Sequence, residues 1–397
     1  MTRADVILGG STSTNNRNGV QSAYMVYTAT AVYAFFISGA DNGVQWVKST
    51  DNKITWSDPV LVNTIATAQG FSVWYDGWTE GDGGTDIMLV YFESSADDVY
   101  SRKLDTATDT LGSEVVIFAG ASTGVIANSC IAVAKARGGN YLCMFDIDGG
   151  TEVGTYRSTD DGVSWGARSN VGGTEGADYY TLWPGYAADN QDFLCLFWDR
   201  SASEISRKMY DDSGDAWSED SIVASMTAIA SSTATPHFAG TIDHDANKIY
   251  MIAWNARKTA NADLRFFTVD DSSDTEGTAV VSNGTDDQTL CALARDTVSG
   301  DLYAYYGGKS DGSENVGVAI NIYYKVSTDD GATWGAETQL TITARNFDTL
   351  FTSPLFTGDH NVFYQSQTTG IDNVLASALL PSGGGGNTYV LSGIMGG

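Results

Sequence analysis

Positive charge is scarce in this chain. Its 397 residues include 21 Lys and Arg against 49 Asp and Glu, which gives a formal net charge of −28 at pH 7. An acidic surface of this kind repels a phosphate backbone, so the composition argues against nucleic acid as a partner. The acidity is typical of a protein that stays soluble in a salty medium.

Cysteine and long apolar runs are also scarce. The four cysteines lie too far apart for a disulfide framework, so we expect free, buried thiols. No stretch of about 18 apolar residues occurs, which predicts that the chain does not insert into a membrane. The first thirty residues lack the basic start and apolar core of a signal peptide. We therefore expect synthesis in the cytoplasm without a signal peptide.

The sequence has few groups that could hold a metal or a cofactor. Its three histidines lack metal-ligand spacing, and it contains no Gly-rich phosphate loop. Two acidic loops, at residues 82–86 and 146–148, could offer oxygen ligands to calcium. Neither has a full ligand pattern, so we favour solvated turns. We predict no cofactor, with calcium as the alternative.

A short motif recurs along the chain. It is Ser-Thr-Asp-Asp-Gly-Val-Ser-Trp at residues 158–165, nearly the same at 327–334, and more divergent at 49–56. Each copy follows strand-forming residues, which predicts a hairpin turn. In such a turn Asp accepts backbone N–H bonds, Gly takes a positive φ, and Trp packs on the neighbouring sheet. With a weaker copy included, the structural residues are Ser49, Asp51, Trp56, Ser158, Asp160, Gly162, Trp165, Asp211, Trp217, Ser327, Asp329, Gly331 and Trp334.

A second repeat consists of short apolar strands spaced about 52 to 60 residues apart. Four short strands fit into such a period, which is typical of a propeller blade. The pattern predicts an all-β, seven-bladed β-propeller over residues 1–380; six blades is the alternative if one repeat is spurious. The strand at residues 5–8 has no unit of its own. We expect it to close the ring as the outer strand of the last blade, because an open array leaves unpaired edges. The seven instances are residues 31–36, 86–91, 140–145, 192–197, 248–253, 301–306 and 361–364.

The composition changes after residue 380. Residues 381–386 form a Gly-rich linker, and a short apolar segment follows it. We expect this tail, residues 381–397, to contact copies of the chain or another protein; a disordered tail is the alternative. The expected contact residues are Tyr389, Val390, Leu391, Ile394 and Met395.

The motif at residues 327–334 resembles the Asp-box, or BNR repeat, of sialidase-like β-propellers. The copy at 158–165 has Ser for Thr, and the copy at 49–56 has Lys53 for Gly. The resemblance covers about residues 5–380 and implies the propeller fold. It implies less about function, because Asp-boxes also occur in non-catalytic carbohydrate-binding, receptor and viral proteins. In that family the boxes lie at the periphery, away from the active site.

The catalytic pattern of the resembling family is not matched. Sialidases hold the substrate carboxylate with three arginines and use a Tyr nucleophile, a Glu base and an Asp acid. The first arginine normally lies in a Phe/Tyr-Arg-Ile-Pro motif, which this chain lacks. We therefore assign no catalytic residue and disfavour an enzyme. Arg200, Arg257 and Arg345 fall on expected loops opposite the boxes, so a carboxylate clamp stays as an alternative.

Aromatic and polar residues are expected on the same loops. Rings and amide or carboxylate groups together suit a sugar, by stacking and hydrogen bonding. The alternative is that these aromatic residues belong to the core. The complete candidate glycan face is Tyr179, Tyr180, Trp183, Asp199, Arg200, Asn255, Arg257 and Arg345.

These observations favour a non-catalytic propeller in a larger assembly. By analogy with phage structural proteins, we expect a viral surface, tail or decoration protein on the virion, with host glycans as its ligand. Two alternatives are a stand-alone carbohydrate-binding, lectin-like propeller and a sialidase-like glycoside hydrolase.

Overall fold

β-strands dominate the computed structural model. Within the residues that it describes, the only helix is the short 3-10 turn η1 (Asp76–Trp78), which confirms the all-β class. The described residues are 6–11, 23–38, 43–51, 53, 55–63, 68–93, 95, 97–120, 131–147, 152–171, 177–186, 189–199, 204–218, 221–225, 238–254, 262–284, 290–311, 313, 319–341, 344, 346–358, 361–368 and 371–378.

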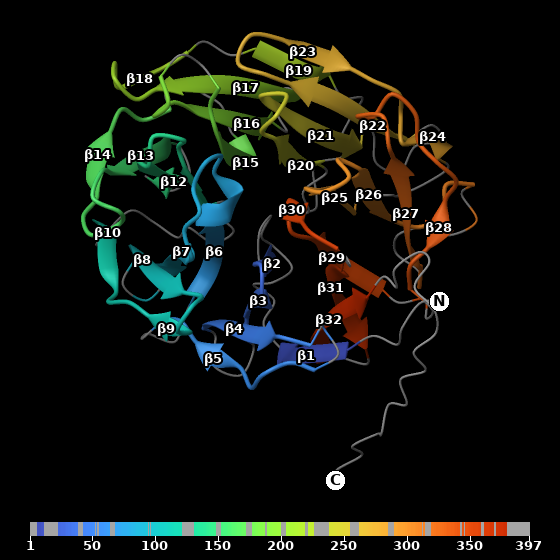
Figure 1. Ribbon diagram of the computed structural model, residues 1–397, viewed down its shortest axis with the longest axis horizontal. Coiled ribbons are helices and arrows are strands. Elements are labelled where there is room, and N and C mark those ends of the chain that lie inside the picture. The colour runs from blue at the N-terminus through green and yellow to red at the C-terminus, as the bar shows by residue number, and fades with distance from the viewer. Residues whose placement is uncertain are drawn as a thin grey trace.

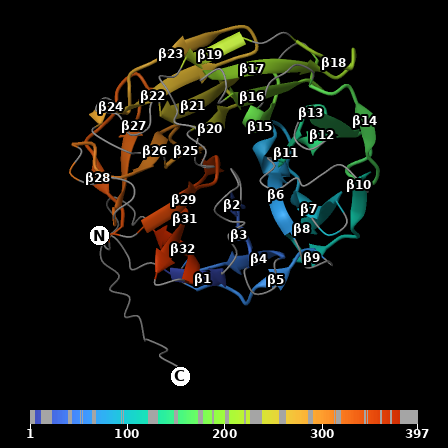
Figure 2. The ribbon, with the colours of Figure 1, turned by 180° about the vertical axis from the view of Figure 1, so that it is seen from behind.

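The strands form a β-propeller, in which separate sheets surround a common centre (Figures 1 and 2). Five of the sheets are each built from one continuous segment, and a sixth from one such segment plus one late strand; we call them blades 1 to 6 in chain order. Blade 1 contains β2 (Ala23–Tyr27), β3 (Val32–Ile37), β4 (Val44–Ser49) and β5 (Val60–Leu61). Blade 2 contains β6 (Ala68–Tyr75), β7 (Asp86–Glu93), β8 (Asp98–Asp105), β9 (Thr110–Leu111) and β10 (Val115–Ala119). Blade 3 contains β11 (Ile131–Lys135), β12 (Tyr141–Ile147), β13 (Glu152–Ser158) and β14 (Gly166–Arg168).

The remaining blades follow the same antiparallel plan. Blade 4 contains β15 (Ala177–Pro184), β16 (Phe193–Asp199), β17 (Glu204–Asp211), β18 (Ala216–Trp217) and β19 (Ser221–Ser225). Blade 5 contains β20 (Phe238–Asp243), β21 (Lys248–Trp254), β22 (Ala262–Val269), β23 (Asp274–Glu276) and β24 (Val281–Gly284). Blade 6 contains β25 (Cys291–Asp296), β26 (Leu302–Gly307), β27 (Ile322–Ser327) and β28 (Thr338–Gln339). The late strand β30 (Leu355–Phe356) joins blade 6 by pairing parallel to β25.

One further sheet combines strands from both ends of the chain, and we call it the composite sheet. Its order is β1 (Val6–Ser11), β32 (Ile371–Ala378), β31 (Asn361–Thr368) and β29 (Asn346–Phe351). The predicted count of seven blades is not supported: the structure shows a propeller of six blades. The strand repeat could not give this count, because it marks where strands occur and not which segments share a sheet.

The two sequence predictions about individual strands are confirmed. All seven predicted apolar strands are present, each paired with the strand of its sheet that lines the central cavity: β3, β7, β12, β16, β21, β26 and β31. The N-terminal strand does complete the last sheet from outside, since β1 pairs antiparallel with β32 from Val6 opposite Ala376 to Ser11 opposite Asp372. Its bounds are residues 6–11, whereas the sequence pattern predicted residues 5–8.

The repeated motif forms the predicted turn. At residues 158–165, the Oδ1 atom of Asp160 accepts the backbone N–H of Ser164 at 2.9 Å, and Ser158 Oγ accepts that of Gly162 at 2.8 Å. The turns at 327–334 and 49–56 repeat both bonds. The fifth residue has a φ of +83° at Gly162 and +81° at Gly331, as the pattern predicted. We call these three segments the motif turns.

The Trp of each motif turn contacts the preceding sheet. Trp165 Nε1 donates to Ser101 Oγ of β8 at 3.0 Å, and Trp334 Nε1 donates to the Thr278 carbonyl at 3.1 Å. The Trp334 ring also lies 5.6 Å from that of Phe266 on β22. In blade 4, Trp217 Nε1 donates to the Ser169 carbonyl at 3.1 Å. These contacts join neighbouring blades at the outer edge of the ring, where we expected the Trp to pack.

Basic side chains make a second set of contacts between consecutive blades. In blades 1 to 4, a Lys or Arg on the third strand reaches an Asp in the following blade. We call these contacts the inter-blade ion pairs. They are Lys48–Asp109 at 2.8 Å, Lys103–Asp161 at 2.5 Å, Arg157–Asp212 at 2.7 Å and Arg207–Asp274 at 2.9 Å. Four basic side chains are thus neutralised between blades.

The described part of the chain contains no helix long and apolar enough to cross a membrane. Its three described cysteines, Cys143, Cys195 and Cys291, are free and buried, as the sequence predicted.

A candidate ligand-binding site at the centre of the propeller

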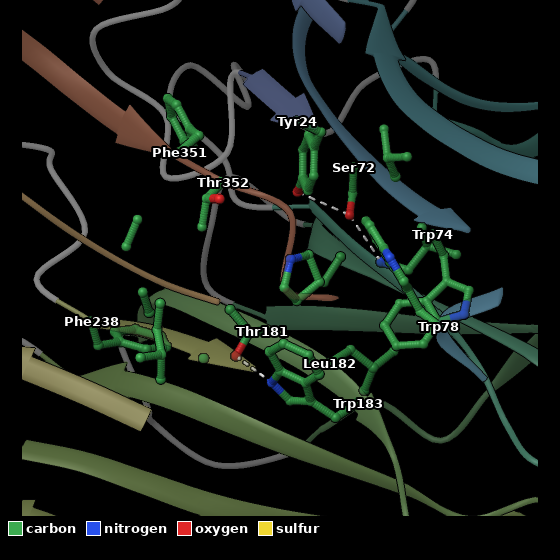
Figure 3. A pocket seen from close by; sticks show the side chains of 18 of the residues that line it. Tyr24, Ser72, Trp74, Trp78, Thr181, Leu182, Trp183, Phe238, Phe351 and Thr352 are labelled. Atoms are coloured by element: carbon green, nitrogen blue, oxygen red, sulfur yellow. Dashed lines mark hydrogen bonds between the residues drawn. The ribbon is translucent and has the colours of Figure 1, made fainter. Parts of the chain in front are cut away.

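A cavity of about 140 Å³ lies where the innermost strands meet (Figure 3). Every sheet contributes its inner strand to the lining, so the cavity is a product of the whole ring. These inner strands are β2, β6, β11, β15, β20, β25 and β29. A volume of this size holds roughly ten water molecules, since one water needs about 10–15 Å³ of such space. It therefore fits one small ring, not an extended chain.

Three tryptophans form one side of the cavity. Trp74 on β6 lies edge-on to Trp78 of η1, with ring centroids 5.6 Å apart, and edge-on to Trp183 of β15 at 6.3 Å. Phe238 and Phe351 lie across from them in Figure 3. Trp74 and Trp183 come from strands of separate blades, whereas Trp78 reaches the cavity because η1 follows β6 directly. The wall is therefore an aromatic surface built from distant parts of the sequence.

Two hydroxyl groups of the lining have a proton available to donate. Ser72 Oγ accepts from the Tyr24 hydroxyl at 3.1 Å and from the Val133 N–H at 3.3 Å, so its own proton is left. Thr181 Oγ1 accepts from Trp183 Nε1 at 3.0 Å, which also leaves its proton. The indole N–H of Trp78 is buried, has no hydrogen-bond partner among the described residues and has no surface open to the cavity. The cavity thus presents two hydroxyl donors within an otherwise apolar wall.

The lining contains no Asp, Glu, Lys, Arg or His within the part of the chain that the structure describes. Its one thiol, Cys291, has a pKa raised by burial and so stays uncharged at neutral pH. Serine, threonine and aromatic side chains supply all the remaining polarity. The site is therefore electrically neutral.

Two segments after inner strands line the cavity on the face that carries the motif turns. The first and third strands of a blade run in the same direction, so the C-terminal ends of the inner strands lie on this face. There η1 follows β6, and Thr79 Oγ1 accepts from Trp74 Nε1 at 3.0 Å and donates to the Lys135 carbonyl at 3.0 Å. On the other side, the Pro354 carbonyl accepts the backbone N–H of Arg295 at 2.9 Å. Both segments contribute to the lining, through Trp78 and Pro354.

Charged groups lie around this end of the cavity. Lys135 Nζ lies 3.0 Å from Asp76 Oδ1 and 2.7 Å from Asp82 Oδ2, and Arg295 lies 3.0 Å from Asp243. Each of these cations has a carboxylate partner, and none of the five side chains lines the cavity.

Tyr186, His244 and Asp271 form a neighbouring cluster that joins blades 4 and 5. The Tyr186 hydroxyl is 2.8 Å from His244 Nδ1, and burial lowers the pKa of His244. Burial raises the pKa of Asp271 to about 6, against the lowering effects of the Tyr186 backbone N–H and of Arg137. None of these three side chains lines the cavity. Their ionisation therefore bears on stability and not on the site.

The structure places the predicted glycan-face residues in different surroundings. Trp183 does line the cavity, but it lies near the motif-face end of β15 and not on a loop of the opposite face. Tyr180 is also in β15, and it is fully buried with its hydroxyl 3.2 Å from Asp146 Oδ1. The expectation of a surface loop was wrong because this segment pairs along its length with β16.

The other predicted residues cannot be placed as side chains. Tyr179 and Asp199 belong to the paired strands β15 and β16, but their side chains lie outside what the structure describes. The remaining predicted residues fall outside the described part of the chain; they are Arg200, Asn255, Arg257 and Arg345, and the tail residues Tyr389, Val390, Leu391, Ile394 and Met395.

Sequence reasoning missed most of the cavity. Ser72, Trp74, Trp78 and Thr181 have no shared motif, and they meet only through the ring. One signal was available: Trp74 and Trp78 precede the Gly-rich segment at 81–84, an insertion after an inner strand. Such an insertion indicates a loop that covers something at the centre.

The candidate calcium loops have other contacts. Asp82 pairs with Lys135 and accepts the backbone N–H of Gly84 at 2.8 Å, and Asp146 accepts the Tyr180 hydroxyl. In the described residues, no group of three or more His, Cys, Asp or Glu could hold a metal ion.

Comparison with solved structures identifies the fold. A point mutant of the NanB sialidase from Streptococcus pneumoniae superimposes with a TM-score of 0.50 and 12% sequence identity, over 94% of this chain and 70% of that one. The chain has a sialidase-like β-propeller fold. Other similar structures are the SapL1 lectin in complex with alpha methyl fucoside (TM-score 0.49, 10% identity, 82% of this chain and 98% of that one) and AofleA from Arthrobotrys oligospora (TM-score 0.48, 11% identity, 82% and 88%). No protein-family model and no curated protein matches this chain.

Proposed function

We propose that this protein is a non-catalytic, carbohydrate-binding β-propeller that holds one sugar ring in the central cavity. The observation that carries the proposal is the aromatic wall of Trp74, Trp78 and Trp183 beside the donors of Ser72 and Thr181. A pocket with large apolar faces and a few placed polar groups is the usual form of a small-ligand site. The apolar face of a sugar packs on such rings, and its hydroxyl oxygens accept the protons. The sialidase-like fold supports a carbohydrate ligand by analogy.

The chemistry of the lining favours binding over hydrolysis. A Tyr nucleophile needs a base to take its proton, and glycoside hydrolysis needs carboxylates beside the scissile bond. Tyr24 is the one tyrosine in the described lining, and its hydroxyl donates to Ser72 Oγ and not to a carboxylate. We therefore propose that a bound sugar leaves the cavity unchanged.

A panel of free monosaccharides and methyl glycosides, titrated calorimetrically into the full chain, tests this function. We expect one or more sugars to bind, and Trp183→Leu to weaken that binding about 5- to 30-fold by removing one aromatic face, equivalent to about 1–2 kcal/mol. Trp198→Leu is the control, because Trp198 is equally buried but does not line the cavity. Equal weakening in both variants would indicate general destabilisation and count against the site. Release of reducing sugar from glycosides would contradict the non-catalytic assignment.

We further propose that the composite sheet acts as a seventh blade. Its inner strand β29 contributes Leu350 and Phe351 to the same cavity as the inner strands of blades 1 to 6. Its outer strand β1 gives it the four strands that a blade requires. On this proposal, residues 1–380 form one propeller domain.

The setting of the propeller in an assembly is also a proposal. We propose that residues 381–397 attach it to its own copies or to another protein, on a viral surface or tail where the cavity meets host glycans. The apolar residues after the Gly-rich linker support this. Native mass spectrometry of the chain with and without residues 381–397 tests this proposal. We expect only the longer chain to assemble. A monomeric state of both chains would contradict the proposal.

A further inference from the structure

From the charges around the cavity, we infer that the site selects neutral sugars and rejects sugars that carry a carboxylate. This inference rests on the proposed function and names the substrate class of the same site. It follows from three properties of the cavity: which charges line it, which partners the surrounding cations have, and which hydrogen-bonding groups it offers.

A carboxylate in this cavity would lose its water without gaining a counter-ion. The described lining has no basic side chain, and most of its residues are apolar or aromatic. An ionised carboxylate moved from water into such surroundings is strongly disfavoured unless it is paired. Recognition of a carboxylate normally uses the two parallel donors of an Arg fork, and the described lining contains no Arg.

The described cations around this end of the cavity already have partners. Lys135 is held between Asp76 and Asp82, and its backbone carbonyl, not its ammonium, meets the segment that follows β6. Arg295 lies 3.0 Å from Asp243. A third cation, Arg137, donates to the Gly185 carbonyl at 3.0 Å. The net charge of −28 adds a repulsive field for any anion that approaches.

The hydrogen-bonding groups that remain are donors without charge. Ser72 and Thr181 each have a hydroxyl proton left. Sugar hydroxyl and ring oxygens are neutral acceptors and match both groups.

Matched sugar pairs test the selectivity. Each pair has the same ring and differs only at C6: methyl glucoside against methyl glucuronide, and methyl galactoside against methyl galacturonide, with N-acetylneuraminic acid added. For any neutral sugar that binds, we expect its uronate to bind at least 100-fold more weakly. A uronate within threefold of its partner, or N-acetylneuraminic acid as the tightest ligand, would overturn the inference while the proposed function stands. Failure of every sugar to bind would instead overturn the proposed function.

Discussion

At the scale of single residues, the fifth position of the motif turn is limited by two separate constraints. Its backbone takes a positive φ, and in two turns the neighbouring blade lies against its Cα. A Cβ at Gly331 would lie 2.1 Å from Phe266 Cε1, and one at Gly162 would lie 2.4 Å from Met88 Cε. Lys53 occupies the same position with φ +66°, and its Nζ lies 5.0 Å from the Tyr27 ring centroid. The side chain allowed at this position therefore depends on the adjoining blade.

We predict that Gly331→Ala lowers the free energy of unfolding by about 2–4 kcal/mol. Left-handed backbone costs an L-residue about 1–2 kcal/mol, and the overlap with Phe266 adds about 1–2 kcal/mol. Gly81→Ala separates the two effects, because Gly81 has φ +77° but nothing within 4 Å of its Cβ position. In urea unfolding, we expect Gly81→Ala to lose only the backbone contribution to the free energy of unfolding. Equal losses in the two variants would contradict the packing explanation.

Asp271 gives the fold a pH dependence of its own. Its pKa of about 6 in the folded protein lies above the ordinary value of 3.8, because burial disfavours the ionised form. The folded state therefore binds more protons than the unfolded state between about pH 4 and 6, and this contribution to stability is lost as the pH rises through that window.

We predict that Asp271→Asn stabilises the protein at pH 7.5 by about 1–2 kcal/mol, after allowance for partial exposure to solvent, and has little effect at pH 4.

Asp160→Asn should destabilise the protein at neutral pH, because hydrogen bonds from Ser164 lower the pKa of Asp160. Its contribution is present above the ordinary Asp pKa and disappears as the pH falls. Thermal unfolding of each variant across this range measures both effects. A stabilisation by Asp271→Asn that does not change with pH would argue against ionisation as the cause.

At the scale of elements, neighbouring blades are joined by ion pairs of unequal burial. The Arg207 and Asp274 side chains are 10% and 13% exposed, whereas Lys48 and Asp109 are 19% and 39% exposed. Arg207 also donates to the Asp270 carbonyl at 2.8 Å. A buried pair matters chiefly because removal of one partner leaves the other uncompensated.

We predict that Arg207→Met lowers the free energy of unfolding by about 3–5 kcal/mol, because Asp274 then stays buried without its cation. Lys48→Met at the exposed pair should cost less than about 1 kcal/mol. The double variant Arg207→Met/Asp274→Leu should recover much of the loss. Denaturant titrations compare the three variants, and a double variant less stable than Arg207→Met would refute this mechanism.

At the scale of the whole molecule, ring closure depends on a strand from the far end of the chain. β1 covers the edge of β32, which would otherwise present unpaired backbone groups. The inner strand of the same sheet, β29, lines the cavity. Closure and the candidate site are therefore physically connected.

We predict that deletion of residues 1–11 lowers the midpoint of thermal unfolding by several degrees and promotes association through the exposed edge of β32. Size-exclusion chromatography and thermal unfolding measure the two effects. Deletion of residues 381–397 is the control, because it shortens the chain without removing a strand of the composite sheet. A monomer of unchanged midpoint after the first deletion would show that β1 does not hold the ring closed.

The sequence by itself determined the local elements of this protein. The hydrogen bonds of the motif turns join residues only four positions apart, and the apolar strands are recognisable from their own composition. Closure by the first strand was also predictable, since an unpaired repeat must complete another sheet.

Only the tertiary structure decided the composition of the cavity and the origin of each sheet. The residues that line the cavity lie between Tyr24 and Pro354 in the sequence, and they share no sequence motif. Trp183 was predicted as part of a glycan face and lines the cavity, but its neighbours Trp74 and Trp78 were not predicted. The physical reason is one of range: a turn is specified by adjacent residues, whereas a neutral aromatic cavity exists only when strands from the whole chain converge on one axis.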